Sequence, residues 1–134
     1  DILECVNRIA DEYIEKRPWQ DEEGRDGQTN PFIEEAKEYI VEHYAEEMTL
    51  GEVAEHIGIS SGYLSTLFMQ ILGCGFVDYL QEFRITRACS YLQQNYLKIY
   101  EIAYKVGFRD EKYFSRVFKK LRGMSPKEYR LKNS

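Results

Sequence analysis

The chain contains the same pattern of residues twice. Residues 49–80 align with residues 98–130, with one extra residue in the second copy between Gly107 and Tyr113. The identical pairs are Glu52/Glu101, Ala54/Ala103, Gly58/Gly107, Tyr63/Tyr113, Ser65/Ser115, Phe68/Phe118, Gly73/Gly123 and Tyr79/Tyr129. Five further pairs are apolar in both copies. We therefore expect each copy to fold into the same small supersecondary unit.

Within the first copy, the spacing predicts a short helix, a turn and a longer helix. Thr49 and Glu52 have the spacing of a capping box, and Gly58 is a natural helix end. Ser60 can cap the longer helix, which should end near Gly73. The residues predicted to form its buried face are Leu64, Leu67, Phe68 and Ile71.

The second copy has the same signals for helix starts and helix ends. A short helix is predicted over about 99–106 and ends at Gly107, and Asp110 can cap the helix that follows. That helix should end near Gly123, with Phe114, Val117, Phe118 and Leu121 on its buried face.

A short helix, a glycine-containing turn and a longer helix make up the helix-turn-helix arrangement, in which the second helix lies in a DNA major groove. The small side chains of Ala54 and Ala103 allow close packing of the two helices in each copy. The glycines in the turns can adopt positive φ at no steric cost. A helical bundle with a duplicated hairpin remains the alternative interpretation.

The rest of the chain is also predicted to be helical, and no segment shows the alternation of a strand. A long helix is expected over about 76–94, another after Asn30-Pro31, and a last one after Ser125-Pro126. Residues 2–16 have helical spacing, and residues 20–30 read as a linker. The fold class is therefore all-α. We divide it into an N-terminal segment (1–30) and a DNA-binding domain (31–134), with helix-turn-helix units at about 49–73 and 98–123 joined by the helix at 76–94.

Charge is distributed unevenly along the 134 residues, whose net charge is −5. Residues 1–48 hold fifteen acidic and five basic side chains, whereas residues 49–134 hold eight acidic and thirteen basic ones. Such asymmetry indicates a basic surface for an anionic partner in the second part.

Other classes of function have little support in the sequence. The two histidines, His43 and His56, fall on different predicted helices, and no Cys/His metal spacing, phosphate-binding glycine loop or nucleophile motif occurs. We therefore expect no enzyme activity, no metal and no cofactor. Three cysteines at unrelated spacings fit a reducing cytoplasm, and no apolar run is long enough to span a membrane.

Three stretches carry a family resemblance: EVAEHIGISSGYLSTLF, FRITRACSYL and EIAYKVGFRDEKYFSRVFKKLRGMSPKEYR. They resemble the AraC/XylS family of bacterial transcription regulators over about 31–131. The resemblance implies two helix-turn-helix units joined by a long helix, each presenting a recognition helix to the same face of DNA. The sequence of the first repeat is similar to that of family members in which this domain follows the receiver domain of a two-component response regulator.

Candidate DNA-contacting residues follow from the faces opposite the apolar positions, and the resemblance places base contacts on the same faces. For base contact we predict Gly62, Ser65, Thr66, Lys112, Ser115 and Arg116. Arg116 can donate two hydrogen bonds to guanine, whereas Ser and Thr read bases ambiguously. A phosphate contact or a solvated surface arginine is the alternative for Arg116.

For phosphate contact we predict Ser61, Arg84, Arg87, Lys119, Lys120, Arg122 and Lys127, with Arg130 as a further candidate. Solvated helix faces are the alternative for these side chains, and Arg84 matches a family arginine that can pack within the domain instead.

The predicted function is sequence-specific binding of double-stranded DNA, with two recognition helices in successive major grooves of an asymmetric site. The alternative is a helical protein-interaction module, for example one that contacts RNA polymerase, with little DNA binding. Because the chain begins at Asp1 rather than Met, we expect an upstream sensor or receiver domain in a longer protein.

Overall fold

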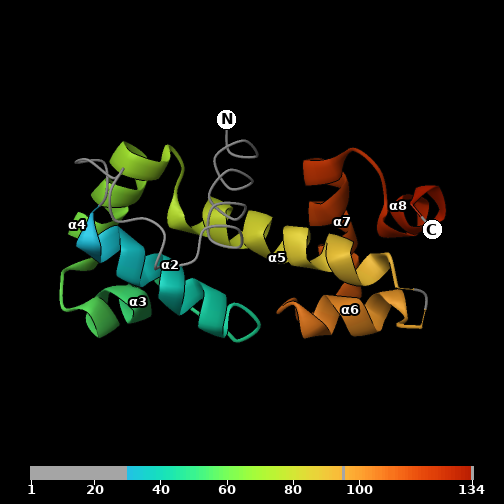
Figure 1. Ribbon diagram of the computed structural model, residues 1–134, viewed down its shortest axis with the longest axis horizontal. Helices are drawn as coiled ribbons and strands as arrows, with labels where there is room; N and C mark the ends of the chain where they lie inside the picture. The colour runs from blue at the N-terminus through green and yellow to red at the C-terminus, as the bar shows by residue number, and fades with distance from the viewer. Residues whose placement is uncertain (1–29, 95, 134) are drawn as a thin grey trace, which may run out of the picture. The chain divides into compact units, whose positions relative to one another are not determined.

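The structure is a computed structural model that describes residues 30–94 and 96–133, so the predictions for residues 1–29 lie outside the described part. The described residues are helical, without a strand, which confirms the all-α prediction. Figure 1 shows their order along the chain. The helices are α2 (Pro31–His43), α3 (Leu50–Ile57), α4 (Ser61–Leu67), the π-helix η2 (Phe68–Leu72), α5 (Phe76–Leu92), α6 (Ile99–Lys105), α7 (Glu111–Arg122) and α8 (Pro126–Lys132).

The helix starts lie where the capping residues predicted them. Thr49 accepts a hydrogen bond from the amide of Glu52, whose carboxylate accepts one from the amide of Thr49. Ser125 and Glu128 form the same reciprocal pair at the start of α8. At α6 only half of the box forms, because the Lys98 side chain has no acceptor for an amide. The carboxylate of Glu101 still accepts from the amide of Lys98.

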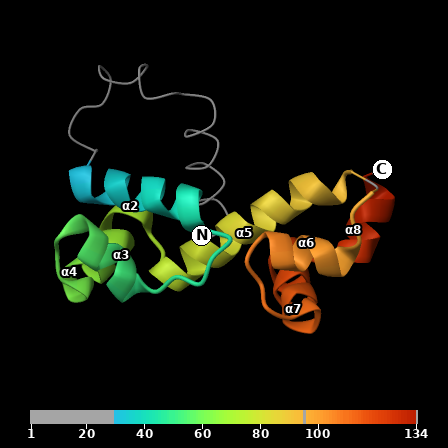
Figure 2. The same ribbon diagram turned by 90° about the horizontal axis from the view of Figure 1, so that it is seen from below.

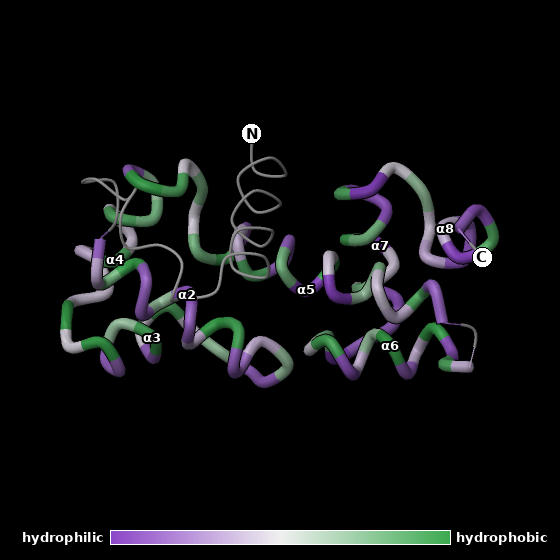
Figure 3. Tube along the Cα trace, in the orientation of Figure 1, coloured by the Kyte–Doolittle hydropathy of each residue, from purple (hydrophilic) through white to green (hydrophobic). Residues whose placement is uncertain are grey.

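Two compact units make up the described part, and α5 contributes to both. The first unit holds α2, α3, α4, η2 and the start of α5 up to Leu80. Its buried side chains include Ile33 and Ile40 of α2, Val53 of α3 and Phe68 of η2, all at most 1% exposed. Each of these helices turns its apolar side inward. Figure 3 shows the corresponding change between hydrophobic and hydrophilic segments along the trace.

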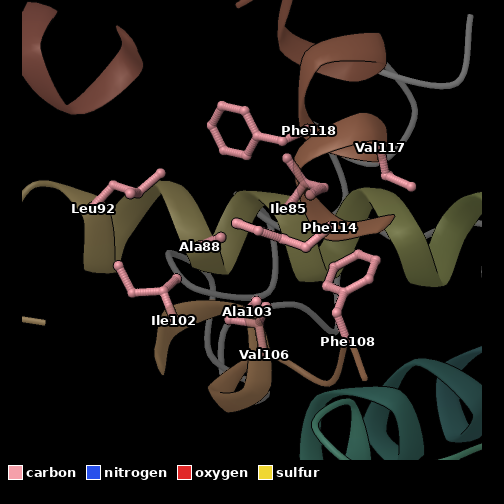
Figure 4. Close-up of a cluster of buried hydrophobic side chains, with 10 residues drawn as sticks. All are labelled: Ile85, Ala88, Leu92, Ile102, Ala103, Val106, Phe108, Phe114, Val117 and Phe118. Atoms are coloured by element: carbon pink, nitrogen blue, oxygen red, sulfur yellow. The ribbon is translucent and has the colours of Figure 1, made fainter. Parts of the chain in front are cut away.

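The second unit holds the segment Tyr44–Glu47 and the chain from Gln81 onward. Its core lies where α5, α6 and α7 meet, and Figure 4 shows the ten buried residues that form it. They are Ile85, Ala88, Leu92, Ile102, Ala103, Val106, Phe108, Phe114, Val117 and Phe118. Ala103 is fully buried between its neighbours, as expected for a small residue that lets two helices pack closely. Figure 2 shows α6 and α7 from another side.

The end of the first recognition helix differs from the prediction. Leu64, Leu67 and Phe68 are buried as expected, but Ile71 is 37% exposed and Leu72 is buried instead. The cause is the π-helix Phe68–Leu72, in which each turn contains about one extra residue and the buried face moves on by one position. Gly73 then ends the helix with φ +79°.

No single helix in residues 30–94 and 96–133 is long and apolar enough to cross a membrane. Ser61–Leu72 and Phe76–Leu92 reach that length and composition only as a pair bent by 60°.

Candidate nucleic-acid interface

The first recognition helix presents a face of short side chains. Ser60 caps it by accepting a hydrogen bond from the amide of Tyr63, which fixes where the helix begins. The four residues on its exposed side that were predicted to contact DNA are all solvent-exposed: Ser61, Gly62, Ser65 and Thr66. No charged side chain occurs in α4 or η2. This helix therefore offers hydroxyl groups, a methyl group and Met69 to a partner.

Gly62 and Thr66 lie one turn apart on this exposed side. A Cβ atom added to Gly62 would meet nothing within 4 Å, so the helix surface is open there. The hydroxyl of Thr66 donates a hydrogen bond to the Gly62 carbonyl oxygen at 3.1 Å. Because its proton is directed at the helix backbone, the Thr66 hydroxyl can offer an outside partner only its lone pairs, beside the methyl group.

The second recognition helix, α7, presents a cationic face. Asp110 caps it by accepting from the amide of Lys112. Lys112 and Arg116 are exposed, whereas Ser115 is half-buried. Phe114, Val117 and Phe118 anchor the opposite side in the core of the second unit. The three predicted base-contacting residues of this helix are thus held on one rigid element.

The Arg116 guanidinium lies over an aromatic ring. Its carbon Cζ is 5.5 Å from the centroid of the Tyr113 ring. The hydroxyl of Tyr113 accepts a hydrogen bond from Nε2 of Gln81 on α5 at 2.7 Å. The spacing of three residues between Tyr113 and Arg116 is visible in the sequence, but the partner on α5 is not.

Arg84 does not lie free on the surface for a phosphate. Its Nε donates to the carbonyl oxygen of Tyr44 at 2.7 Å, and its Nη2 donates to that of Glu46 at 2.8 Å. Burial lowers the pKa of Arg84 from its usual value. Arg84 thus ties the segment after α2 to the second unit, in agreement with a packing role.

Arg122 is likewise engaged inside the second unit. Its Nη1 lies 2.5 Å from Oε2 of Glu82, and its Nη2 donates to the hydroxyl of Thr86 at 3.0 Å. The side chain of Glu82 is fully buried. Burial raises the pKa of Glu82, and the positive charge of Arg122 opposes that rise without cancelling it. We therefore remove Arg84 and Arg122 from the expected phosphate-contacting surface, because both guanidinium groups are used within the fold.

Two other arginines have partners in the second unit. The Nε of Arg87 lies 3.4 Å from the hydroxyl oxygen of Tyr44, and this contact raises the pKa of Arg87. Arg130 donates to the carbonyl oxygens of Leu92 and Gln94 at 3.1 and 3.0 Å. It therefore satisfies carbonyl groups at the end of α5, where a cation also complements the helix dipole. Helical periodicity alone carries no signal for this role.

The remaining predicted phosphate-contacting residues are Ser61, Lys119, Lys120 and Lys127, and all four are exposed. The lysines lie on α7 and at the start of α8. They form the cationic surface that remains after the internal arginines are set aside.

Other kinds of site have little basis in the described residues. Across 30–94 and 96–133, no three His, Cys, Asp or Glu side chains come close enough together to hold a metal ion. A shallow surface hollow lies beside Tyr39, Glu52, Glu55 and His56. The Tyr39 ring packs against the imidazole of His56, with centroids 4.7 Å apart, so this histidine is an exposed helix residue with an aromatic neighbour.

Comparison with known proteins agrees with this arrangement of helices. A family model described as a helix-turn-helix domain matches residues 53–132. The arabinose operon regulatory protein of Escherichia coli is 39% identical over 99 residues, which cover 73% of this chain and 34% of that protein. The chain belongs to the AraC-type helix-turn-helix family of DNA-binding domains.

Solved structures of the C-terminal domains of response regulators are similar to this one. The C-terminal domain of AraT from Geobacillus stearothermophilus is 38% identical with a TM-score of 0.74, and the match covers 77% of this chain and 86% of that one. The C-terminal domain of the two-component response regulator YesN from Fusobacterium nucleatum is 40% identical with a TM-score of 0.71, and covers 75% and 99%. This AraC-type domain spans about a third of the length of the arabinose operon regulatory protein.

Proposed function

We propose that this AraC-type domain binds double-stranded DNA with sequence preference, as the DNA-contacting part of a bacterial transcription regulator. The observation that carries the proposal is the pair of recognition helices, each anchored on its apolar side and exposed on the other. Placed in successive major grooves, about 34–36 Å apart, the two helices contact one asymmetric site.

The two helices divide the recognition unequally. Arg116 offers a bidentate contact to guanine and Lys112 a contact to guanine or phosphate, with Ser115 beside them. Gly62, Ser65 and Thr66 offer close approach and contacts to base edges without charge. Ser61 in the first unit and Lys119, Lys120 and Lys127 in the second contact phosphates and release counterions in this proposal, with Arg87 as a further candidate.

The proposal extends to the protein that contains the domain. Because the similar structures from AraT and YesN are C-terminal parts of response regulators, an upstream receiver domain is the natural source of control. Such a regulator acts in the cytoplasm, recruits or blocks RNA polymerase, and needs no catalytic activity or cofactor of its own.

The test begins with selection of preferred duplexes from a random DNA library, followed by dissociation constants across a range of salt concentrations. We expect the logarithm of the binding constant to fall linearly with the logarithm of salt concentration, by about 0.9 for each phosphate neutralised. Arg116→Ala should cost about 1–3 kcal/mol and relax the preference at one base pair.

The contrary outcomes are equally clear. Affinity that does not depend on salt, or loss of affinity for all sequences alike in Arg116→Ala, contradicts the proposed roles. Capture of RNA polymerase by a chain that binds no duplex favours the protein-interaction module instead.

A further inference from the structure

The position of Tyr113 suggests a role that base-contact prediction alone does not reveal. This tyrosine is 40% exposed, so its ring is only partly used in packing. One edge meets Phe108, with ring centroids 5.9 Å apart, and its face lies under the Arg116 guanidinium. Its hydroxyl is held by Gln81 of α5. The ring is therefore fixed from two sides and presents a surface to the arginine.

The face of the Tyr113 ring restricts the conformations of the Arg116 side chain. An exposed arginine samples many rotamers, and ordering it on a base edge has an entropic cost. The face of an aromatic ring attracts a guanidinium and restricts it to fewer directions. An arginine that rests on a fixed ring is thus partly ordered before it meets DNA.

The first copy of the repeat uses the equivalent tyrosine differently. Tyr63 lies edge-on to Phe32 of α2, with centroids 6.0 Å apart. Three residues further along the helix stands Thr66, where the second copy has Arg116. The same tyrosine therefore supports α2 in one copy and a cation in the other, so duplication alone does not explain the contact with Arg116.

We propose that Tyr113 is a positioning residue for Arg116, and that Gln81 fixes the ring which orients the guanidinium toward its base. The inference rests on the proposed function, since it concerns how an arginine of the recognition helix selects DNA. It assigns to Gln81 and Tyr113 a part in specificity without direct contact to a base.

The experiment is a double-mutant cycle on the whole chain. The preferred duplex is compared with a duplex altered at the base pair that Arg116→Ala no longer distinguishes, and the ratio of the two dissociation constants is the discrimination. We expect Tyr113→Leu to lower this ratio roughly two- to fivefold, the range of an exposed cation–π contact. In the Arg116→Ala background, Tyr113→Leu should leave the ratio unchanged.

Two milder variants distinguish the contribution of the Tyr113 ring from that of the hydrogen bond between Gln81 and the Tyr113 hydroxyl. Tyr113→Phe keeps the ring and loses the hydroxyl, and Gln81→Ala removes the donor. Both should lower the discrimination less than Tyr113→Leu does. The variant that carries both changes should lower the discrimination by the same amount as either single change. Tyr63→Phe removes the equivalent hydroxyl in the first copy, and it should leave discrimination at this base pair unchanged.

The outcomes distinguish the two levels of the proposal. If the unmodified chain binds no duplex, the proposed function fails and this inference with it. If it selects a sequence but Tyr113→Leu has the same effect with and without Arg116, only the positioning role is overturned. Should Tyr113→Leu fail to fold, Tyr113→Phe and Gln81→Ala decide, because both must lose their effect when Arg116 is absent.

Discussion

At the residue scale, Lys119 and Arg122 stand three positions apart on α7, and their surroundings give them different chemistry. Lys119 is exposed, and alongside hydrogen bonds from Ser125 its positive charge helps to lower the pKa of Glu128. The side chain of Arg122 is 15% exposed and pairs with Glu82, which is fully buried. Two cations on one helix therefore differ: the Lys119 side chain is exposed to solvent, whereas Arg122 supports the fold from inside.

This difference predicts opposite phenotypes for the two alanine variants. Lys119→Ala should flatten the salt dependence of DNA binding by about one unit of slope, with little change in the free energy of unfolding. Arg122→Ala leaves a buried carboxylate without its partner and should cost about 3–5 kcal/mol of stability. Urea unfolding and salt titrations of both variants measure the two effects. A destabilised Lys119→Ala, or a stable Arg122→Ala, contradicts the assignment.

Glu82 predicts a dependence of stability on pH. Because burial raises its pKa in the folded chain, the folded state binds the proton more tightly than the unfolded state does. Its stabilising contribution is therefore complete below the unfolded-state pKa and is lost as pH rises through the higher folded-state pKa. Relative to Glu82→Gln, the unmodified chain should be most stable in acid and lose that advantage toward neutral pH.

Glu128 supplies the matched control with the opposite sign. Hydrogen bonds from Ser125, the largest of them from its backbone amide, lower the pKa of Glu128. Its contribution is present above the unfolded-state pKa and is lost as pH falls through the folded-state value. Chemical unfolding of Glu82→Gln and Glu128→Gln across pH should show differences from the unmodified chain that change in opposite directions. Parallel changes contradict this prediction.

At the scale of an element, the turn glycines of the two repeats form a natural comparison. Gly58 and Gly107 have φ of +94° and +106°, so both need a backbone that other residues adopt with strain. A Cβ atom at Gly58 would meet nothing within 4 Å. At Gly107 it would lie 2.7 Å from Nε of Arg84 and from the carbonyl oxygen of Tyr44.

Alanine at these two positions should therefore differ in cost. Gly58→Ala should lose about 1–2 kcal/mol, the cost of a left-handed backbone for a residue with Cβ. Gly107→Ala adds crowding against Arg84 and the backbone, which typically costs about a further 1–3 kcal/mol. Thermal unfolding of both variants provides the measurement. Equal losses mean that the second turn relaxes freely around the added methyl group.

Sequence reasoning reaches elements such as these because their signals are local. Thr49, Ser60, Asp110 and Ser125 cap helices through amides two or three residues away, and all four were predicted. The π-helix was missed, because its extra residue leaves no change in composition and shows only as the burial of Leu72 in place of Ile71.

For the candidate site, too, the sequence predicts features that depend on local spacing and misses contacts between distant residues. Helical spacing separates the exposed face of α7 from the face that holds Phe114 and Phe118. It does not reveal that α5 lies beside Arg122, or that the segment after α2 lies beside Arg84, so both arginines were predicted to contact phosphates. Their partners, Tyr44 and Glu82, lie 40 residues away in each case, and only the fold brings them together.

At the scale of the whole molecule, one chain carries two recognition helices with different faces. The first has no charged residue, whereas the second carries Lys112, Arg116 and Lys119. Because the helices are covalently joined in a fixed order, we expect one chain to occupy one non-palindromic site.

This expectation is tested by rearranging the selected site. Inverting one half while keeping the other should lower affinity toward that for unrelated DNA, because the inverted half then faces a helix with the wrong orientation. Restoring both halves in the original order is the control. Stoichiometry from sedimentation should be one chain per duplex. Unchanged affinity for the inverted site contradicts an ordered, asymmetric reading.

The open surface at Gly62 has a consequence for how such a domain acquires new targets. Gly62 is the second residue of α4, and a side chain placed there meets no neighbour, so we expect a larger residue at this position to leave the stability of the fold intact. Most routes to altered specificity trade away some of the fold's stability. If α4 enters the major groove as proposed, a single substitution at Gly62 adds a side chain at the DNA surface without disturbing the fold, so new target preferences can arise in the helix that has no charged residue.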